Sequence, residues 1–146
     1  MSVLTWDTIG SEGTDMTDRE LVDLAFTMLE RSYVPYSNFP VGAALLCKDG
    51  SVFTGCNVEN AAYGSTICAE RTALVKAVSE GHRDDWVAMA VVGNSEQPCW
   101  PCGSCRQMLY EFCPELELLV AGKDHCVQCV MLSELLPHGF GPSHLD

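Results

Sequence analysis

The chain has 146 residues, 47% hydrophobic and 19% charged, a composition typical of a single globular domain large enough to bury a core. Its net charge is −12 with only eight Lys and Arg, none in a run, which disfavours nucleic acid as a partner because gripping a phosphate backbone requires a basic patch. Its apolar stretches are only strand-length and its N-terminus has no basic region, so we expect neither a membrane span nor a secretory signal.

The N-terminal part of the chain is predicted to be a tail followed by a helix. Residues 1–16 contain Gly, Ser, Thr and Asp without periodicity, which is typical of a flexible tail. We therefore place a single domain over 17–146. Thr17 and Glu20 have the spacing of a capping box, and the apolar residues after them recur at helical intervals. This pattern predicts a helix that ends at about Ser32.

Helix and strand patterns alternate through the rest of the domain. The predicted elements are strands over 39–47 and 51–58, a helix from Cys68 to a stop at Gly81, a strand over 86–92, a helix from Pro101 to just before Pro114, strands over 116–121 and 126–132, and a short helix over 133–136. The order α-β-β-α-β-α-β-β-α predicts an α/β fold, namely a three-layer α/β/α sandwich with a five-stranded mixed sheet.

Three cysteines and a glutamate lie at the predicted starts of two helices. Cys102 and Cys105 are three residues apart on one helix, and Cys68 begins the other. Each helix N-terminus carries roughly half a positive charge, which favours thiolate over thiol. Three thiolates holding zinc leave a fourth position for water, and Glu70 beside them can move that water's protons. This pattern predicts a hydrolytic metal site with Glu70 as its catalytic residue.

Such a cluster requires a nearby positive charge. Three thiolates on Zn²⁺ carry a formal charge of −1, and an anionic cluster is poor at acidifying water. Arg71 and Arg106 follow Glu70 and Cys105 and can donate charge-assisted hydrogen bonds to sulfur. Of the two we favour Arg71.

Two other uses of the cysteines remain open. The spacing of a four-cysteine zinc ribbon is met by Cys102, Cys105, Cys126 and Cys129. The last two lie in a predicted strand without the turn residues of a zinc knuckle, which counts against the ribbon. A redox pair of Cys99 and Cys102 is the second alternative. Because nine cysteines without an export signal are typical of a reducing compartment, we expect a cytoplasmic location.

The remaining thiols and imidazoles receive no role from the sequence. Cys47, Cys56 and Cys113 have the pattern of small buried hydrophobic residues. None of the four histidines has the spacing of a metal ligand.

Several strings of the sequence resemble the cytidine deaminase family. They are FPVGAAL at 39–45, NVENA at 57–61, ICAERTA at 67–73, PCGSCRQ at 101–107 and LLPHGFGP at 135–142. The match extends over residues 17–142 in the expected order. The resemblance implies zinc-dependent hydrolytic deamination of cytidine and deoxycytidine in pyrimidine salvage, by a homotetramer with shared active sites. Blasticidin S deaminases and polynucleotide deaminases have related zinc motifs, but a missing basic groove disfavours the latter.

The resemblance also implies a role for individual residues. One zinc ion per subunit would be held by Cys68, Cys102 and Cys105, with Glu70 as the proton shuttle. The implied substrate contacts are Asn57 and Glu59 at the ribose 3′-hydroxyl, Phe39 against the pyrimidine, the Ala69 amide at the pyrimidine carbonyl oxygen, and Tyr63 and Phe140 as aromatic residues from neighbouring subunits. Trp100 departs from the family pattern, which has a small residue before the Pro-Cys pair, and its bulk alters one wall of the expected pocket.

Overall fold

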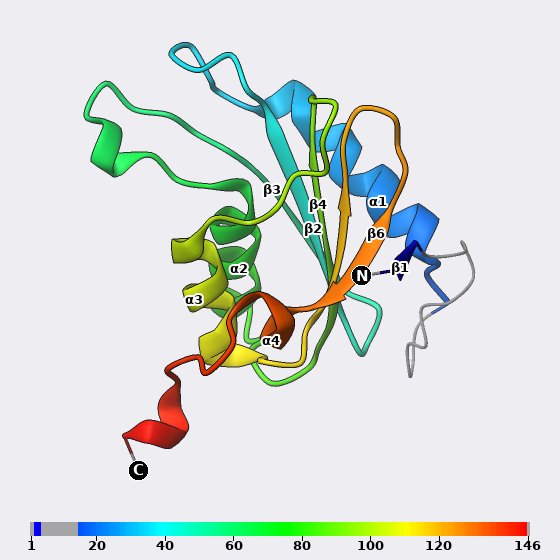
Figure 1. The fold of residues 1–146 in the computed structure, drawn as a ribbon, viewed down its shortest axis with the longest axis vertical. Coiled ribbons are helices and arrows are strands. Elements are labelled where there is room, and N and C mark those ends of the chain that lie inside the picture. The colour runs from blue at the N-terminus through cyan, green and yellow to red at the C-terminus, as the bar shows by residue number, and fades with distance from the viewer. Residues whose placement is uncertain (1, 4–14, 146) are drawn as a thin grey trace.

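The centre of the fold is a mixed β-sheet (Figure 1). The computed structural model describes residues 2–3 and 15–145. The strands are β1 (Ser2–Val3), β2 (Val41–Cys47), β3 (Val52–Cys56), β4 (Trp86–Gly93), β5 (Glu117–Ala121) and β6 (Gln128–Met131). Their order across the sheet is β1-β6-β5-β4-β2-β3, in which β4 and β5 are parallel and the other described neighbours are antiparallel.

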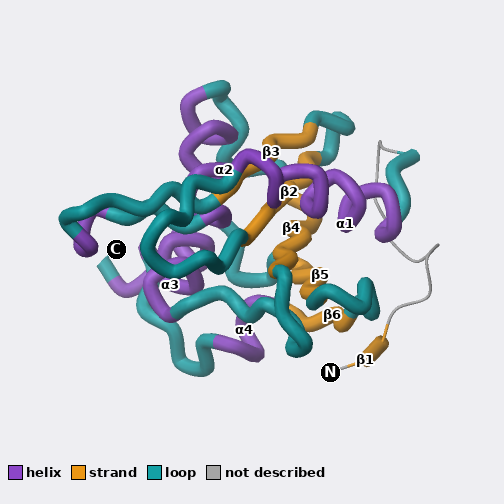
Figure 2. The backbone as a smooth tube through the Cα atoms, turned by 90° about the horizontal axis from the view of Figure 1, so that it is seen from above, coloured by secondary structure: helices purple, strands orange, loops and turns teal. Residues whose placement is uncertain are grey.

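Helices cover both faces of this sheet (Figure 2). The α-helices are α1 (Asp18–Thr27), α2 (Ala69–Ser79), α3 (Gly103–Phe112) and α4 (Leu132–Leu135), and short 3-10 turns are formed by η1 (Met28–Arg31), η2 (Tyr63–Ser65) and η3 (Pro142–His144). Helix α1 packs on one face of the sheet, and α2 and α3 pack on the other. The predicted three-layer sandwich with a five-stranded mixed sheet is confirmed, and the two-residue β1 adds a sixth strand at the edge.

The central strands are apolar on both faces because both are covered. Along β2, Ala43 and Leu45 belong to the core beneath α2 and α3, whereas Ala44 and Leu46 belong to the core beneath α1. All four side chains are fully buried. Successive side chains of a strand point to opposite faces, so a strand between two helical layers is a continuous apolar run.

The sequence predicts some helix boundaries correctly and others with an error of a few residues. The capping box that starts α1 is present, since the Glu20 amide donates to Thr17 Oγ1 at 3.1 Å. That helix ends at Thr27 and continues as η1 instead of remaining α-helical to about Ser32. Helix α3 starts two residues later than predicted, because Cys102 is extended and caps the helix with its sulfur.

The N-terminal residues add one edge pairing to the sheet. Ser2 pairs with Cys129 and Val3 with Gln128. Most of the predicted tail over 1–16 lies outside the described residues, so its boundary with the domain stays a prediction. Within the described residues, the helices are all too short or too polar to cross a membrane.

One close approach fixes the start of α2 against the sheet. A Cβ at Gly55 of β3 would lie 2.3 Å from the carbonyl oxygen of Ala69 and 2.7 Å from the amide nitrogen of Ala73. Only glycine permits backbones to approach so closely. The first turn of α2 therefore rests directly on the backbone of β3.

Candidate metal centre and active site

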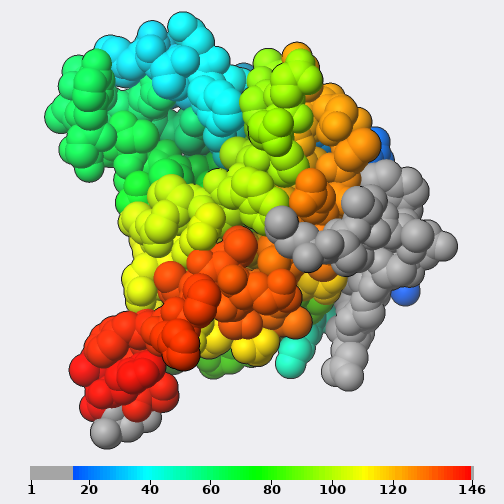
Figure 3. Space-filling model, in the orientation of Figure 1, coloured from blue at the N-terminus to red at the C-terminus, as the bar shows by residue number. Residues whose placement is uncertain are grey.

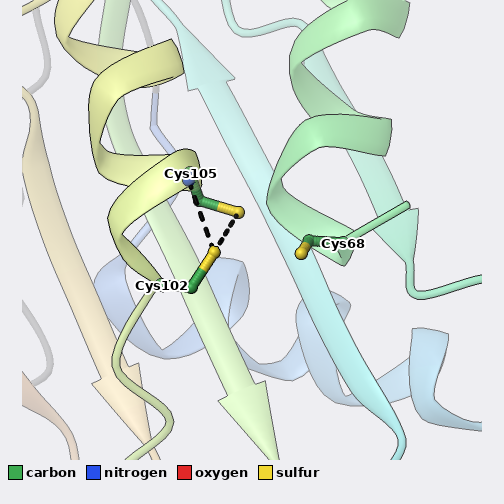
Figure 4. A group of neighbouring side chains, drawn as sticks. All are labelled: Cys68, Cys102 and Cys105. Carbon is green, nitrogen blue, oxygen red and sulfur yellow. Dashed lines mark hydrogen bonds between the residues drawn. The ribbon is translucent and has the colours of Figure 1, made fainter. Parts of the chain in front are cut away.

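Three cysteine sulfurs meet where α2 and α3 begin (Figure 4). Cys68 is the N-cap of α2, Cys102 is the N-cap of α3, and Cys105 lies in the first turn of α3. Their sulfurs all lie within 4.8 Å of one another. Cys102 Sγ lies 3.5 Å from Cys105 Sγ and accepts from the Cys105 amide at 3.5 Å. The positive ends of two helix dipoles therefore point at one cluster of thiols.

The electrostatics of this cluster favour a thiolate at Cys68. The Cys105 thiol, and then the Arg71 guanidinium, lower the pKa of Cys68 to about 5. Nη2 of Arg71 lies 3.5 Å from Cys68 Sγ and 3.1 Å from the carbonyl oxygen of Thr66. The pKa of Cys105 is raised, first by its interaction with the Cys68 sulfur and then by burial. Of these two neighbouring thiols, Cys68 is therefore the one whose ionised form is favoured.

Glu70 is buried next to the sulfurs. It is the second residue of α2 and only 4% of its surface is exposed. Burial raises the pKa of Glu70 to about 7, and the negative charge of Cys68 acts in the same direction. A carboxyl group that titrates near neutral pH can both take up and release a proton during a reaction.

A cavity of about 210 Å³ opens beside Glu70 and the sulfurs. It is lined by Phe39, Val41, Asn57, Thr66, Cys68, Ala69, Glu70, Cys99, Trp100 and Cys102. The fold therefore brings two of the predicted zinc ligands, the predicted catalytic glutamate and three of the predicted substrate contacts to one cavity. Trp100 contributes to its wall, as its position before the Pro-Cys pair suggested.

The remaining predicted contacts lie elsewhere. Glu59 and Tyr63 line a second cavity of about 330 Å³ with Tyr36, Ser37 and Thr66, and Thr66 borders both cavities. Phe140 is 56% exposed, and its ring stacks on His144. It belongs to the C-terminal segment, which is red in Figure 3 and projects from the body of the molecule. It borders neither cavity, so a single chain does not bring Phe140 to the other site residues.

Asn57 and Glu59 hold the loops around these cavities. Asn57 accepts from the Val41 amide at 2.9 Å and donates to the Phe39 carbonyl oxygen at 2.8 Å. Glu59 Oε1 accepts from the amides of Tyr36 and Ser37 at 3.0 and 3.1 Å. The Ser37 side chain, followed by the amides of Ser37 and Tyr36, lowers the pKa of Glu59 and favours its ionised carboxylate. Both side chains thus position backbone segments that border the cavities.

The two alternative uses of the cysteines are not supported. Among the described residues, Cys102 and Cys105 cluster with Cys68 and not with Cys126 or Cys129, which excludes the ribbon. Cys129 instead lies 2.8 Å from Glu117 Oε1. Burial, followed by the charge of Glu70, raises the pKa of Cys99 to about 12. A redox-active cysteine requires the opposite shift.

Thr66 and Cys99 are cavity residues that the sequence did not indicate. Thr66 lies in an irregular loop without periodicity, and its carbonyl oxygen is held by Arg71. Its proximity to the second cavity results from tertiary packing alone. Cys99 entered the sequence analysis only as the partner of Cys102 in an alternative redox pair.

Comparison with known proteins decides the family. Residues 15–121 match the model of the cytidine and deoxycytidylate deaminase zinc-binding region. A cytidine deaminase of Halalkalibacterium halodurans is 53% identical over 125 residues, covering 84% of this chain and 94% of that protein. The chain belongs to the cytidine deaminase family. The predicted membership and the predicted fold are both confirmed.

Solved cytidine deaminase structures agree with this assignment. The crystal structure from Burkholderia pseudomallei has a TM-score of 0.83 and 47% identity, covering 86% of this chain and all of that one. The structure from Mycobacterium tuberculosis has a TM-score of 0.72 and 43% identity, covering 83% of this chain and 94% of that one.

The cluster suits the zinc that characterises the cytidine deaminase family. Three thiolates are soft donors of the type that selects zinc over harder cations. Three protein ligands, instead of four, are typical of a catalytic site and not of a structural one. Cys68, Cys102 and Cys105 are the zinc ligands of this chain.

Proposed function

We propose that this chain hydrolyses cytidine and deoxycytidine to uridine and deoxyuridine with release of ammonia, as part of pyrimidine salvage. The observation that carries the proposal is the position of Glu70, buried within the cavity beside the three-sulfur cluster with its pKa raised to about 7. Membership of the cytidine deaminase family supports the choice of substrate.

Glu70 performs both proton transfers in this scheme. The chemistry that zinc supplies when bound is Lewis acidity, which lowers the pKa of water towards about 7. Glu70 takes a proton from the attacking water and delivers it to N3 of cytosine while the water oxygen bonds to C4. It then passes the second proton of that water to the 4-amino group, which leaves as ammonia while C4 becomes a carbonyl. One group whose pKa lies near the working pH serves as base and then as acid.

The cavity walls orient the base. Phe39 packs against the face of the pyrimidine, and the amide of Ala69 donates to its carbonyl oxygen. That amide belongs to the first turn of α2, where amides have no acceptor within the helix. The backbone carbonyl of Trp100 receives the amino group, and its indole narrows the cavity beside it.

The adjoining cavities favour a nucleoside over a free base. The base occupies the cavity of Glu70, and the ribose extends past Thr66 towards Glu59. Asn57 retains one N–H on Nδ2, and Glu59 retains lone pairs beyond those that Tyr36 and Ser37 use. Both can therefore bind the ribose 3′-hydroxyl.

A homotetramer completes the sites. Tyr63 is 73% exposed and Phe140 is 56% exposed, although large aromatic side chains are usually covered. We propose that these residues reach into the sites of neighbouring subunits. The proposed location is the cytoplasm, a reducing compartment, which agrees with nine cysteines that are all unpaired.

An absorbance assay tests this function. Purified protein is mixed with cytidine, deoxycytidine, free cytosine or blasticidin S, and the ultraviolet absorbance of each is followed. We expect rapid conversion of the two nucleosides, little reaction of cytosine, and loss of activity after chelation that added zinc restores. Deamination of blasticidin S alone would refute the substrate assignment, and full activity after verified removal of zinc would refute the mechanism.

A further inference from the structure

A second group of metal-type ligands lies beyond the other end of α2. Cys47, His82 and Asp85 place a sulfur, a ring nitrogen and a carboxylate oxygen within 4.8 Å of one another. None of the three lines the active-site cavity. We propose that they bind a second divalent cation of the zinc type, which joins the β2–β3 hairpin to the loop between α2 and β4.

The backbone holds this group together. Helix α2 ends at Ser79 and is followed two residues later by Gly81, whose φ of +92° suits glycine. The amides of Gly81 and His82 bond back to the carbonyl oxygens of Val78 and Ala77 at 3.0 and 2.9 Å. These two bonds form a Schellman motif that fixes the direction in which His82 leaves the helix. The Lys48 amide donates to the Asp85 carbonyl oxygen at 2.8 Å, which fastens the hairpin beside the loop.

Among the described residues, one carboxylate oxygen of Asp85 has no hydrogen-bond partner. Its Oδ2 lies 2.8 Å from Nδ1 of His82. Its Oδ1 is buried and has no hydrogen-bond partner. Buried carboxylate oxygens are nearly always satisfied, so an orphan oxygen calls for an explanation such as an ion. A cation between Cys47, His82 and Asp85 provides that partner.

The donor types fit zinc. Thiolate, imidazole and carboxylate are its usual protein ligands, and the charges of Cys47 and Asp85 together neutralise a divalent ion. Asp49 Oδ2 lies 3.7 Å from Nε2 of His82, the nitrogen that remains when Nδ1 binds the ion. Histidine ligands typically have a carboxylate beside their other ring nitrogen, which strengthens binding, and Asp49 supplies one at ion-pair distance.

Binding of the cation requires the Cys47 thiol to lose its proton. Burial, followed by the charges of Asp85 and Asp49, raises the pKa of Cys47 to about 12, so the free thiol is protonated. Its proton passes to solvent as the sulfur–metal bond forms. His82 also borders a cavity of about 370 Å³ with Ser51, Phe53, Lys76, Ser79 and Glu80, which gives the ion a path from solvent.

Zinc content per chain tests the proposal. The intact protein is equilibrated with zinc chloride, freed of unbound metal by gel filtration, and analysed by mass spectrometry. We expect one equivalent of zinc beyond the equivalent that the three-cysteine cluster holds. Cys47→Ala and His82→Ala should each lose that extra equivalent while retaining deaminase activity. Cys113→Ala, which removes a partly buried thiol outside both clusters, should keep it.

Two results would overturn the proposal. One is a single equivalent of zinc in the unmodified protein at saturation. The other is a His82→Ala protein that still binds the extra equivalent of zinc. This variant is the safer test because the His82 side chain is partly exposed, whereas Cys47→Ala opens a cavity in the buried core. Asp49→Asn gives a graded measurement, since replacing the carboxylate beside Nε2 with a neutral amide should weaken zinc binding at this second site by about 10-fold to 100-fold without changing the zinc count at saturation.

Discussion

The guanidinium group of Arg71 and the sulfur of Cys68 form a charged contact, with 3.5 Å between Nη2 and Sγ. The same nitrogen donates to the carbonyl oxygen of Thr66, a residue that borders both cavities. One donor therefore contacts both this loop and the Cys68 sulfur. One positive charge beside three thiolates and a zinc ion makes the group formally neutral. The expectation that Arg71, and not Arg106, faces the sulfurs agrees with this geometry, since Arg106 donates to Pro101 and Leu135.

Arg71→Gln should slow catalysis and weaken zinc binding. Glutamine retains an N–H donor but not the charge, so the cluster becomes anionic and its Lewis acidity falls. We expect a loss of about 10-fold to 100-fold in zinc affinity or activity. The pH–rate profile should shift to higher pH, because water near an anionic cluster deprotonates less readily. Zinc content and the pH–rate profile are measured on the same preparation, with Arg106→Gln as the matched control. If neither changes in Arg71→Gln, the proposed charge compensation by Arg71 is wrong.

Glu70→Ala should separate chemistry from metal binding. Because Glu70 is proposed to move protons and lies outside the three-cysteine cluster, the variant should bind a normal amount of metal at the three cysteines. Its kcat should fall by about 10²-fold to 10⁴-fold, the usual contribution of general acid–base catalysis. Zinc content and steady-state kinetics are compared on the same preparation. A parallel loss of zinc would instead identify Glu70 as a ligand.

Cys68→Ala should abolish both zinc at this cluster and activity. Two thiolates cannot hold the ion as three do, and the contact of Arg71 with sulfur also disappears. Cys129→Ala removes a thiol of the excluded ribbon and should keep its zinc. Metal analysis distinguishes the two, and a Cys68→Ala protein that retains zinc at Cys102 and Cys105 would refute the three-cysteine site.

Mixing two inactive variants tests whether subunits share active sites. Phe140→Ala removes the aromatic side chain proposed to enter a neighbouring site, and Glu70→Ala removes the proton shuttle. Tetramers reassembled from both chains contain some sites with an intact Glu70 and an intact Phe140 from different subunits. We expect activity above that of either variant alone. If subunits are shown to exchange but the activity of the mixture only equals the summed activities of the two variants, Phe140 does not contribute to a neighbouring active site.

The sequence predicted most of the fold because burial on both faces leaves clear patterns. The apolar run of β4 and the capping box at Thr17 each have one physical interpretation. The start of α3 was misplaced because Cys102 caps the helix through sulfur, whereas cap residues are normally Ser, Thr, Asp or Asn. Strand β1 was missed because two residues cannot display a period.

The site was predictable where its residues share a short motif. Cys68 with Glu70, and Cys102 with Cys105, each lie within one helical turn, so local spacing reveals them. Thr66 reaches the cavities through loop packing that no local pattern encodes. The cluster of Cys47 and His82 was likewise missed, since the hairpin and the end of α2 meet only in the folded sheet.

The approach of β3 to α2 at Gly55 makes the geometry of the site depend on a residue that does not line its cavity. The atoms nearest a Cβ there belong to the backbone of α2, which cannot turn aside as a flexible side chain can. Any larger residue would move Ala69 and Glu70 together, shifting the amide proposed to bind the pyrimidine carbonyl oxygen and the carboxyl proposed to transfer protons. A substitution at Gly55 would therefore impair catalysis although it leaves the identity of every site residue unchanged.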